Sequence, residues 1–350
     1  MKTFYTLFIF TLVGTCATTK YTTKIKNLKE GIKLVDSTLV LNYANTISAK
    51  ELSSHLYKFS SNEFLGRKTG ETGHKKASQF LKSYYQNENI ESPYKGSNYN
   101  QTIPEDFFNG KTKSSENVLA YIEGSEKPNE VVIISAHLDH LGVSEQGEIY
   151  NGADDDGSGT VAIMEIAQAF NQAKKDGVGP KRSVLFLHFT AEEIGKLGSE
   201  YYTQNPVFPL ENSVTNLNID MIGRVDDAHL NNKNYIYLIG SDRLSKELHY
   251  TSEKINNSYF NINIDYKYNV EGEKNRYYTR SDHYNFAKHG IPVIFYFNGE
   301  HDDYHKVSDT PDKIDYKLLE TRTKLIFATA WQLANQQHRI AKDEDNEFLK

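Results

Sequence analysis

Histidine and acidic side chains gather in five separate segments of this 350-residue chain. Four of the segments directly follow apolar runs, and one is a short acidic turn between the first two runs. The segments are 135–140, 152–159, 190–193, 220–223 and 300–305. Histidine nitrogens and carboxylate oxygens, without cysteine, are the ligands of a catalytic zinc or a related divalent ion. The sequence therefore predicts a divalent-metal site built from these segments.

Alternating strands and helices must position these segments. Short apolar or β-branched runs predict strands at 117–123, 131–136, 183–189, 214–219, 235–239 and 292–297. Apolar residues at helical spacing predict helices at 49–59, 72–85, 158–173, 197–203, 244–255 and 315–337. This alternation indicates an α/β fold, in which helices cover both faces of a mostly parallel central sheet in a three-layer sandwich. Ligands bind such sheets outside the carboxyl ends of the strands, and the metal-type residues follow those ends.

Composition excludes several classes of protein. Charged residues make up 25% of the chain and aromatic residues 12%, values that are typical of a soluble globular protein. The 40 basic and 46 acidic residues give a net charge of −6, so no basic excess is present to bind nucleic acid. The single cysteine, Cys16, excludes a disulfide framework and a cysteine-based zinc site.

The N-terminal residues predict export. Lys2 precedes an apolar stretch at 4–13, which is typical of a signal peptide over residues 1–16 and too short to span a bilayer of about 30 Å. The end of this stretch, Val-Gly-Thr-Cys, resembles a bacterial lipobox, in which the cysteine becomes the lipidated first residue. Thr15 departs from that pattern, so secretion with an unmodified Cys16 is the alternative. We expect a protein of the periplasm or cell envelope that is lipid-anchored at Cys16, or otherwise secreted.

The remaining chain predicts one domain between two polar segments. Residues 17–45 are rich in threonine and lysine and predict a polar tether with at most one short helix. Residues 46–340 predict a single catalytic domain, and residues 341–350 a polar C-terminal tail.

Five motifs resemble those of the M28 metallopeptidase family, in the order and spacing of that family. They are His-Leu-Asp-His-Leu-Gly at 137–142, Gly-Ala-Asp-Asp-Asp-Gly-Ser-Gly at 152–159, Thr-Ala-Glu-Glu-Ile-Gly at 190–195, Asn-Ile-Asp-Met-Ile-Gly at 218–223 and Tyr-His-Lys-x-x-Asp-Thr at 304–310. The resemblance covers roughly residues 46–338. It implies a secreted or membrane-anchored aminopeptidase that acts on peptides or proteins through two co-catalytic Zn²⁺ ions. We expect a monomer.

The resemblance also implies the metal ligands. His137 and Asp220 would hold one zinc ion, and Glu193 and His305 would hold the other. Asp155 would bridge both ions, and the peptide bond after it is expected to be cis. All five positions carry the residue type that the family uses there, which favours an active enzyme.

Three further residues take catalytic roles by the same resemblance. Glu192 would accept the proton of the attacking water and pass it to the leaving amine. Asp139 would hold the second ring nitrogen of His137. Tyr304 would donate a hydrogen bond to the developing oxyanion. The segment 282–283 also recurs in the family and would either line the pocket or pack in a loop.

Several alternatives stay open. Spacing alone allows His301 in place of His305 as a ligand. Glutaminyl cyclases are relatives that use one zinc ion, and a carboxypeptidase would need Arg224 or Arg280 to face the pocket and bind a substrate carboxylate. A non-catalytic binding module is a further alternative, which the intact ligand set disfavours. The His-x-His-x-Asp-His signature of metallo-β-lactamase-like hydrolases is only partly matched, because Ser135 stands at its first histidine.

Overall fold

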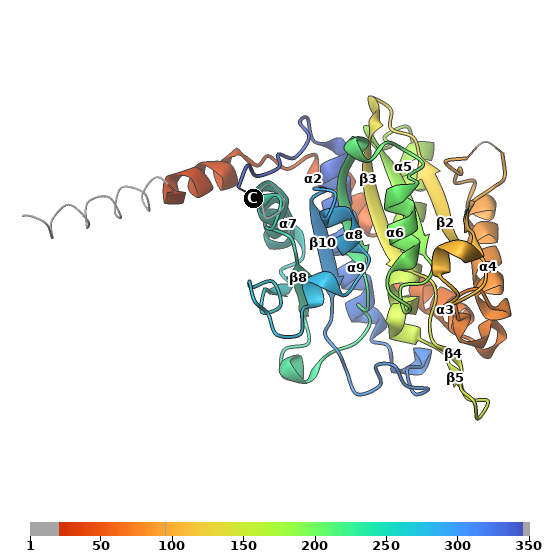
Figure 1. Ribbon diagram of the computed structural model, residues 1–350. Helices are drawn as coiled ribbons and strands as arrows, with labels where there is room; N and C mark the ends of the chain where they lie inside the picture. The colour runs from red at the N-terminus through yellow and green to blue at the C-terminus, as the bar shows by residue number, and fades with distance from the viewer. Residues whose placement is uncertain (1–20, 95, 346–350) are drawn as a thin grey trace, which may run out of the picture.

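The computed structural model describes residues 21–94 and 96–345 (Figure 1). The predicted signal peptide, including Cys16, and residues 346–350 of the predicted tail lie outside the described residues. Within the described part of the chain, no helix has both the length and the apolar character needed to cross a membrane.

An eight-stranded sheet with the order β1-β2-β6-β3-β7-β10-β8-β9 forms the centre of the molecule. Its four middle strands are parallel: β6 (Arg182–Phe189), β3 (Lys127–His137), β7 (Ser213–Ile219) and β10 (Val293–Phe297). On one flank, β2 (Ser115–Ile122) pairs antiparallel with β6, and β1 (Asn100–Ile103) pairs antiparallel with β2. On the other flank, β8 (Tyr235–Ile239) pairs antiparallel with β10, and β9 (Asn263–Asp265) is parallel to β8. A small ribbon, β4 (Gly142–Val143) and β5 (Ile149–Tyr150), follows β3. The predicted α/β class is confirmed.

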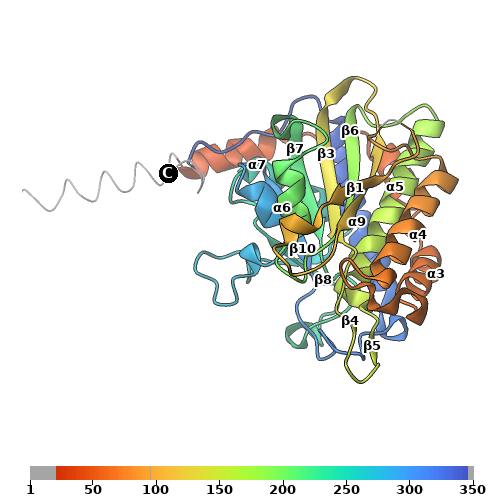
Figure 2. The ribbon, with the colours of Figure 1, turned by 45° about the vertical axis from the view of Figure 1, so that its right-hand side comes forward.

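Helices cover both faces of the sheet (Figures 1 and 2). One face packs against α3 (Ala49–Phe59), α4 (Thr72–Glu88), α5 (Gly159–Lys175), α7 (Lys246–Tyr259) and α9 (Tyr316–Asn335). The other face packs against α6 (Leu197–Gln204) and α8 (His283–Ala287). Alternate residues of β3 supply the two cores: Val132 and Ile134 face the first, and Val131 and Ile133 face the second. Burial on both faces explains why the middle strands are almost wholly apolar.

The predicted polar tether differs from the structure over its second half. Residues 37–44 form helix α2 (Ser37–Ala44), which buries Val40, Tyr43 and Ala44. The ring of Tyr43 stacks on Trp331 of α9, with the ring centroids 5.5 Å apart, and its hydroxyl donates to Asp176 at 2.9 Å. This packing makes α2 part of the domain, because a helix of eight residues is too short to be stable by itself.

The described start of the predicted C-terminal tail is also bound to the domain. Asp343 forms an ion pair of 2.7 Å with Lys246 at the start of α7, and the Ser245 hydroxyl donates a hydrogen bond to the carbonyl of Ala341. Residues 341–343 therefore lie against α7.

Candidate metal centre

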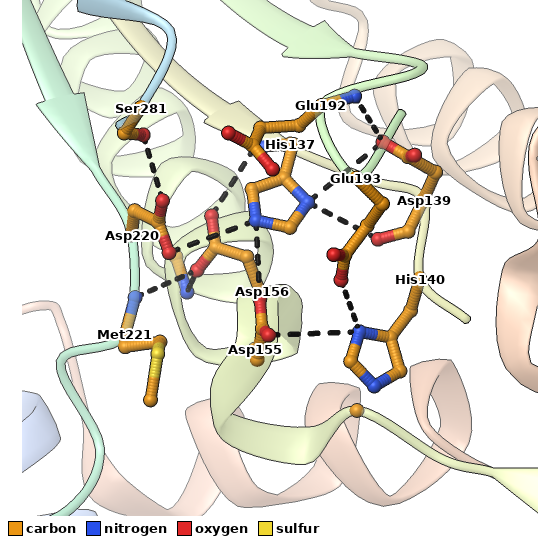
Figure 3. Close-up of polar contacts among 12 residues, drawn as sticks. His137, Asp139, His140, Asp155, Asp156, Glu192, Glu193, Asp220, Met221 and Ser281 are labelled. Carbon is orange, nitrogen blue, oxygen red and sulfur yellow. Dashed lines mark hydrogen bonds and ion pairs between the residues drawn. The ribbon is translucent and has the colours of Figure 1, made fainter. Parts of the chain in front are cut away.

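The five predicted metal ligands meet at the carboxyl edge of the middle strands, and Figure 3 shows four of them, His137, Asp155, Glu193 and Asp220. His137 is the last residue of β3, and Asp220 directly follows β7. Glu193 lies in the loop after β6, and His305 lies in the loop after β10. Asp155 comes from the turn that precedes α5. Because these four strands are neighbours and run in the same direction, segments far apart in the sequence reach one edge.

The ligands form two groups that share Asp155. His137 Nε2 lies 3.2 Å from Asp155 Oδ1 and 3.6 Å from Asp220 Oδ1. His305 Nε2 lies 3.0 Å from Asp155 Oδ2 and 3.2 Å from Glu193 Oε2. We call His137, Asp155 and Asp220 the first metal position, and Asp155, Glu193 and His305 the second metal position. The two carboxylate oxygens of Asp155 thus face different positions.

The spacing within both groups fits a zinc ion. Donor atoms on one tetrahedral zinc, each about 2.0–2.1 Å from the ion, lie about 3.3 Å apart. The measured separations of 3.0–3.6 Å between donors bracket that value. In addition, Asp155 Oδ2 is buried, and its nearest ion-pair neighbour within the described residues is His305 Nε2 at 3.0 Å, itself a metal-type donor. A cation between these two atoms would satisfy both.

His301, the alternative to His305 in the sequence, points elsewhere. Its Nε2 lies 3.1 Å from Asp154 Oδ2, and its side chain is 3% exposed. Asp154 also accepts a hydrogen bond from the backbone of Gly223 at 2.6 Å. The structure therefore brings His305, and not His301, to the second metal position. The peptide bond between Asp155 and Asp156 is cis, as expected.

Backbone at the edge of the sheet turns sharply into the loops. Ala191, Met221 and His305 have φ values of 59°, 61° and 56°, in the left-handed region that non-glycine residues rarely adopt. Ala191 and Met221 lie next to predicted site residues, and His305 is itself a predicted site residue. Such conformations cost of order 1 kcal/mol or more and cluster at functional sites, where the surrounding fold holds them.

Asp139 is held in place differently from the prediction. Its carboxylate oxygen Oδ1 lies 3.8 Å from His137 Nδ1, and the nearer acceptor for that nitrogen is the backbone carbonyl of Asp139, at 3.1 Å. The carboxylate instead accepts hydrogen bonds from the Thr69 hydroxyl at 2.8 Å and from the backbone N–H of Glu192 at 3.1 Å. Asp139 therefore orients His137 through its main chain and the Glu192 loop through its side chain.

A cleft opens in front of the two metal positions. Besides the five predicted ligands, its walls are formed by Glu192, Met221, Tyr277, Arg280, Ser281, Phe295, Phe297, Glu300 and Tyr304. Tyr304 stacks on the ring of His305 at a centroid distance of 3.9 Å. The aromatic and methionine side chains form one apolar wall.

Both arginines considered for carboxylate binding are paired with acids. Arg280 lines the cleft, but its Nη1 lies 2.8 Å from Glu300, and its guanidinium lies over the ring of Tyr277. Arg224 does not line the cleft and pairs with Asp303 at 2.9 Å. The segment 282–283 is buried behind the cleft wall rather than lining it.

Two adjacent acids have opposite pKa shifts. Burial raises the pKa of Glu192 well above its ordinary value, and the charge of Asp282 adds to this effect. Burial and the charge of Asp155 also act to raise the pKa of Glu193, but hydrogen bonds from histidines, beginning with His140, outweigh them and leave it lowered. Neighbouring groups whose pKa values are driven apart are typical of a proton-transfer residue beside a charged ligand.

Three residues of the site had no assigned role in the sequence analysis. Ser281 donates a 2.7 Å hydrogen bond to Asp220 Oδ2, and it lies beside the recurring segment 282–283, which was the one available signal. His140 lies 2.7 Å from Glu193. Arg67 is fully buried and donates to the loops on both sides of the site, including the carbonyls of Leu138 and Gly152.

Comparison with known proteins agrees with these motifs. The model of peptidase family M28 matches residues 117–330. Leupeptin-inactivating enzyme 1 of Streptomyces exfoliatus is 30% identical over 207 residues, which cover 59% of this chain and 40% of that protein.

Solved structures share the fold at lower identity. BSAP, a zinc aminopeptidase from Bacillus subtilis, superposes with a TM-score of 0.64 at 15% identity over 87% of this chain and 99% of that chain. A glutaminyl cyclase from Bacteroides thetaiotaomicron superposes with a TM-score of 0.65 at 18% identity over 81% of this chain and 98% of that chain. The family model spans more than half of the sequence and includes all five predicted motifs. The chain therefore belongs to peptidase family M28.

Proposed function

We propose that this chain is a zinc-dependent aminopeptidase that removes residues from the free N-termini of peptides and proteins. The observation that carries the proposal is the position of Asp155, whose Oδ1 faces His137 and whose Oδ2 faces His305. Two complete donor groups thus share one carboxylate, as a pair of co-catalytic ions requires. When bound, the zinc ions supply a Lewis acid that activates water and polarises the peptide carbonyl.

Two side chains of the cleft are placed to move protons and bind charge. Glu192 lines the cleft without belonging to either metal position, so its carboxylate is free to accept the proton of the attacking water and deliver it to the leaving amine. In the zinc-free site, burial raises the pKa of Glu192, and the positive charge of bound zinc would act to lower it again. Tyr304 lies beside His305 with its hydroxyl available to donate to the oxyanion.

The charge of the cleft argues against a carboxypeptidase. Arg280 is the one lysine or arginine among the described residues that line the cleft, and Glu300 neutralises it. A carboxypeptidase would need an unpaired cation in the cleft to bind the substrate carboxylate, and Arg280 is not unpaired. The cleft therefore favours a substrate without a carboxylate next to the scissile bond.

The apolar wall favours apolar side chains at the substrate N-terminus. Met221, Phe295 and Phe297 are at most 3% exposed and line the cleft together with Tyr277. Full burial of a leucine- or phenylalanine-sized side chain contributes about 1.5–3 kcal/mol, and contact with the exposed part of this wall contributes a fraction of that energy. We expect leucyl, methionyl and phenylalanyl anilides to be cleaved faster than aspartyl or glycyl anilides, as measured by kcat/KM.

The central test combines metal content with a Glu192→Gln variant. The wild-type chain should bind two zinc ions and release N-terminal residues from peptides. Glu192→Gln should keep both ions, because Glu192 belongs to neither metal position, and lose at least about 100-fold in kcat, which is the usual contribution of a general base. An active Glu192→Gln enzyme would show that another group moves the proton.

The same measurements separate the glutaminyl cyclase alternative. A cyclase would bind one zinc ion and convert N-terminal glutamine to pyroglutamate, with no release of other residues. The presence of His137 and Asp220 beside Asp155 favours the two-ion hydrolase.

We further propose that the protein acts as an exported monomer attached to the membrane through Cys16. A signal-type segment that ends in the one cysteine of the chain supports this proposal. Expressing cells should incorporate labelled palmitate into the wild-type protein and not into Cys16→Ser. If the wild-type protein carries no label but is recovered from the medium, ordinary secretion replaces the lipid anchor.

A further inference from the structure

We propose that His140 is a positioning residue of the second metal position, which it serves by holding the Glu193 carboxylate. His140 donates Nδ1–H to Glu193 Oε1, and the other oxygen, Oε2, then faces His305. This inference rests on the proposed two-zinc function.

The oxygen that each histidine contacts, more than the distance alone, separates His140 from the metal ligands, and His140 Nδ1 is 3.8 Å from Asp155 Oδ2, whereas His305 Nε2 is 3.0 Å from it. His140 Nδ1 lies 2.7 Å from Glu193 Oε1, a normal hydrogen-bond length and shorter than the spacing of about 3.3 Å between donors on one zinc ion. The pairs assigned to the metal positions are 3.0–3.6 Å apart. His140 also contacts a different oxygen of Glu193 from the one that faces His305. These contacts place His140 behind Glu193 as a donor, although it is close enough to be a candidate ligand.

The ring of His140 is fixed by its surroundings. The residue is 1% exposed, and its backbone N–H bonds to the carbonyl of Arg67. The ring lies against Gly152, where a Cβ atom would lie 2.5 Å from His140 Cδ2. Gly152 has a φ of 55°, so both its conformation and its close contact favour glycine. The second ring nitrogen, Nε2, is buried with no hydrogen-bond partner in the described part of the chain, which leaves the bond to Glu193 as the ring's short polar contact.

The first metal position uses the same arrangement. Ser281 donates to Asp220 Oδ2 at 2.7 Å, and Asp220 Oδ1 faces His137. At both positions one oxygen of a carboxylate is held by a neighbouring donor, and the other oxygen is directed at the metal position. Partners of this kind orient metal ligands, and their loss typically weakens metal binding by 10–100-fold.

Two substitutions of His140 test the proposal without relying on activity. His140→Asn keeps an N–H donor near the position of Nδ1, and His140→Leu removes the donor at similar size. Zinc-free chains would be titrated with zinc against a chromophoric chelator. We expect His140→Leu to bind two ions at saturation with one of them weakened about 10–100-fold, and His140→Asn to stay within a few-fold of wild type.

Ser281→Ala serves as the matched control, because it removes the corresponding donor at the first metal position. Ser281→Ala should weaken zinc binding at the first metal position. The double variant Ser281→Ala, His140→Leu should then weaken zinc binding at both positions, each by the amount seen in the corresponding single variant. The proposal is overturned if His140→Leu binds zinc as wild type does, or if both His140 variants bind a single ion, which would make His140 a ligand. A wild-type chain that binds fewer than two ions would instead overturn the proposed function.

Discussion

Three consecutive aspartates have three different tasks in one turn. Asp154 accepts the backbone N–H of Gly223 and contacts His301, so it braces two loops. Asp156 accepts backbone N–H groups from β3, α5 and the loop after β7, including that of His137. Only Asp155 directs both carboxylate oxygens at histidines of the metal positions. The outer two aspartates thereby fix the turn that holds the bridging one.

Protonated histidines in the zinc-free site predict a pH-dependent affinity for zinc. Burial acts to lower the pKa of His305, but Asp155 and Glu193 outweigh it and raise this pKa to about 10. Burial also acts to lower the pKa of His137, but the charge of Asp220 and the contacts with Asp155 outweigh burial. They raise the pKa of His137 well above its ordinary value. Both imidazoles therefore carry a proton at pH 7 in the zinc-free chain, and zinc must displace it because only the neutral ring binds metal.

The sign of this effect follows from the raised pKa values. Protons compete with zinc for the two histidines most strongly at pH values below these raised pKa values, and this competition falls as the pH rises towards 10. The apparent zinc affinity should therefore increase between pH 6 and pH 9. Calorimetric titrations in two buffers of different ionisation enthalpy should detect about one to two protons released per chain at pH 7. Proton release near zero, with a constant affinity over this range, would contradict the prediction.

At the scale of elements, Arg67 connects the loops that carry the site. It lies in the turn η1 (Asn62–Arg67) and donates to the carbonyl oxygens of Leu138, Asn151 and Gly152 at 2.6–2.9 Å. Its guanidinium also lies over the ring of Phe59, 4.6 Å from the centroid. One buried side chain thus joins the loop after β3 to the turn before α5.

Arg67→Met should therefore destabilise the chain strongly. The substitution leaves several buried carbonyl groups without a donor, and each costs about 1–3 kcal/mol, so a loss of at least about 3 kcal/mol is expected. Urea unfolding of the zinc-free proteins would measure it. Arg276→Met, at an exposed arginine, is the control and should change stability by less than about 0.5 kcal/mol. Equal midpoints for the two variants would contradict the role of Arg67.

The long elements were predictable from sequence because their own side chains form the core. The predicted helix at 49–59 coincides with α3, and the predicted strand at 235–239 coincides with β8. The short elements were not predicted. Strands β1 and β9 have only four and three residues at the flanks of the sheet, and their sequences are mostly polar. Helix α2 depends on α9 for its stability, and a local sequence pattern carries no sign of that contact.

The candidate site divides in the same way. Residue type and position after a strand indicated the segments of the site, because parallel neighbouring strands end at one edge, and the resemblance to the M28 family selected the five ligands within them. The direction of each side chain was not predictable. Asp139 bonds to His137 through its carbonyl rather than its carboxylate, and His301 turns to Asp154, because those choices depend on loop conformation.

At the scale of the whole molecule, the order of the strands explains the assembly of the site. β6, β3, β7 and β10 are neighbours in space although they span residues 127–297. Residues 37–44 and the C-terminal helix α9 then close one face of the sheet from the two ends of the domain. The N-terminal contribution extends to residues 32–35, where the backbone of Lys33 and Val35 bonds to the Gln332 side chain at 2.9 Å.

Truncation tests whether the domain starts before residue 46. A chain that begins at residue 32 keeps α2 and should unfold close to the longer protein, since residues 21–31 are mostly exposed and contacts such as the ion pair between Lys29 and Glu253 lie at the surface. A chain that begins at residue 46 loses Val40 and Tyr43 and exposes Trp331. Each lost side chain contributes about 1.5–3 kcal/mol, so urea unfolding should show a loss of roughly 3–6 kcal/mol. Equal stability of the two truncated chains would mean that residues 32–45 are a tether after all.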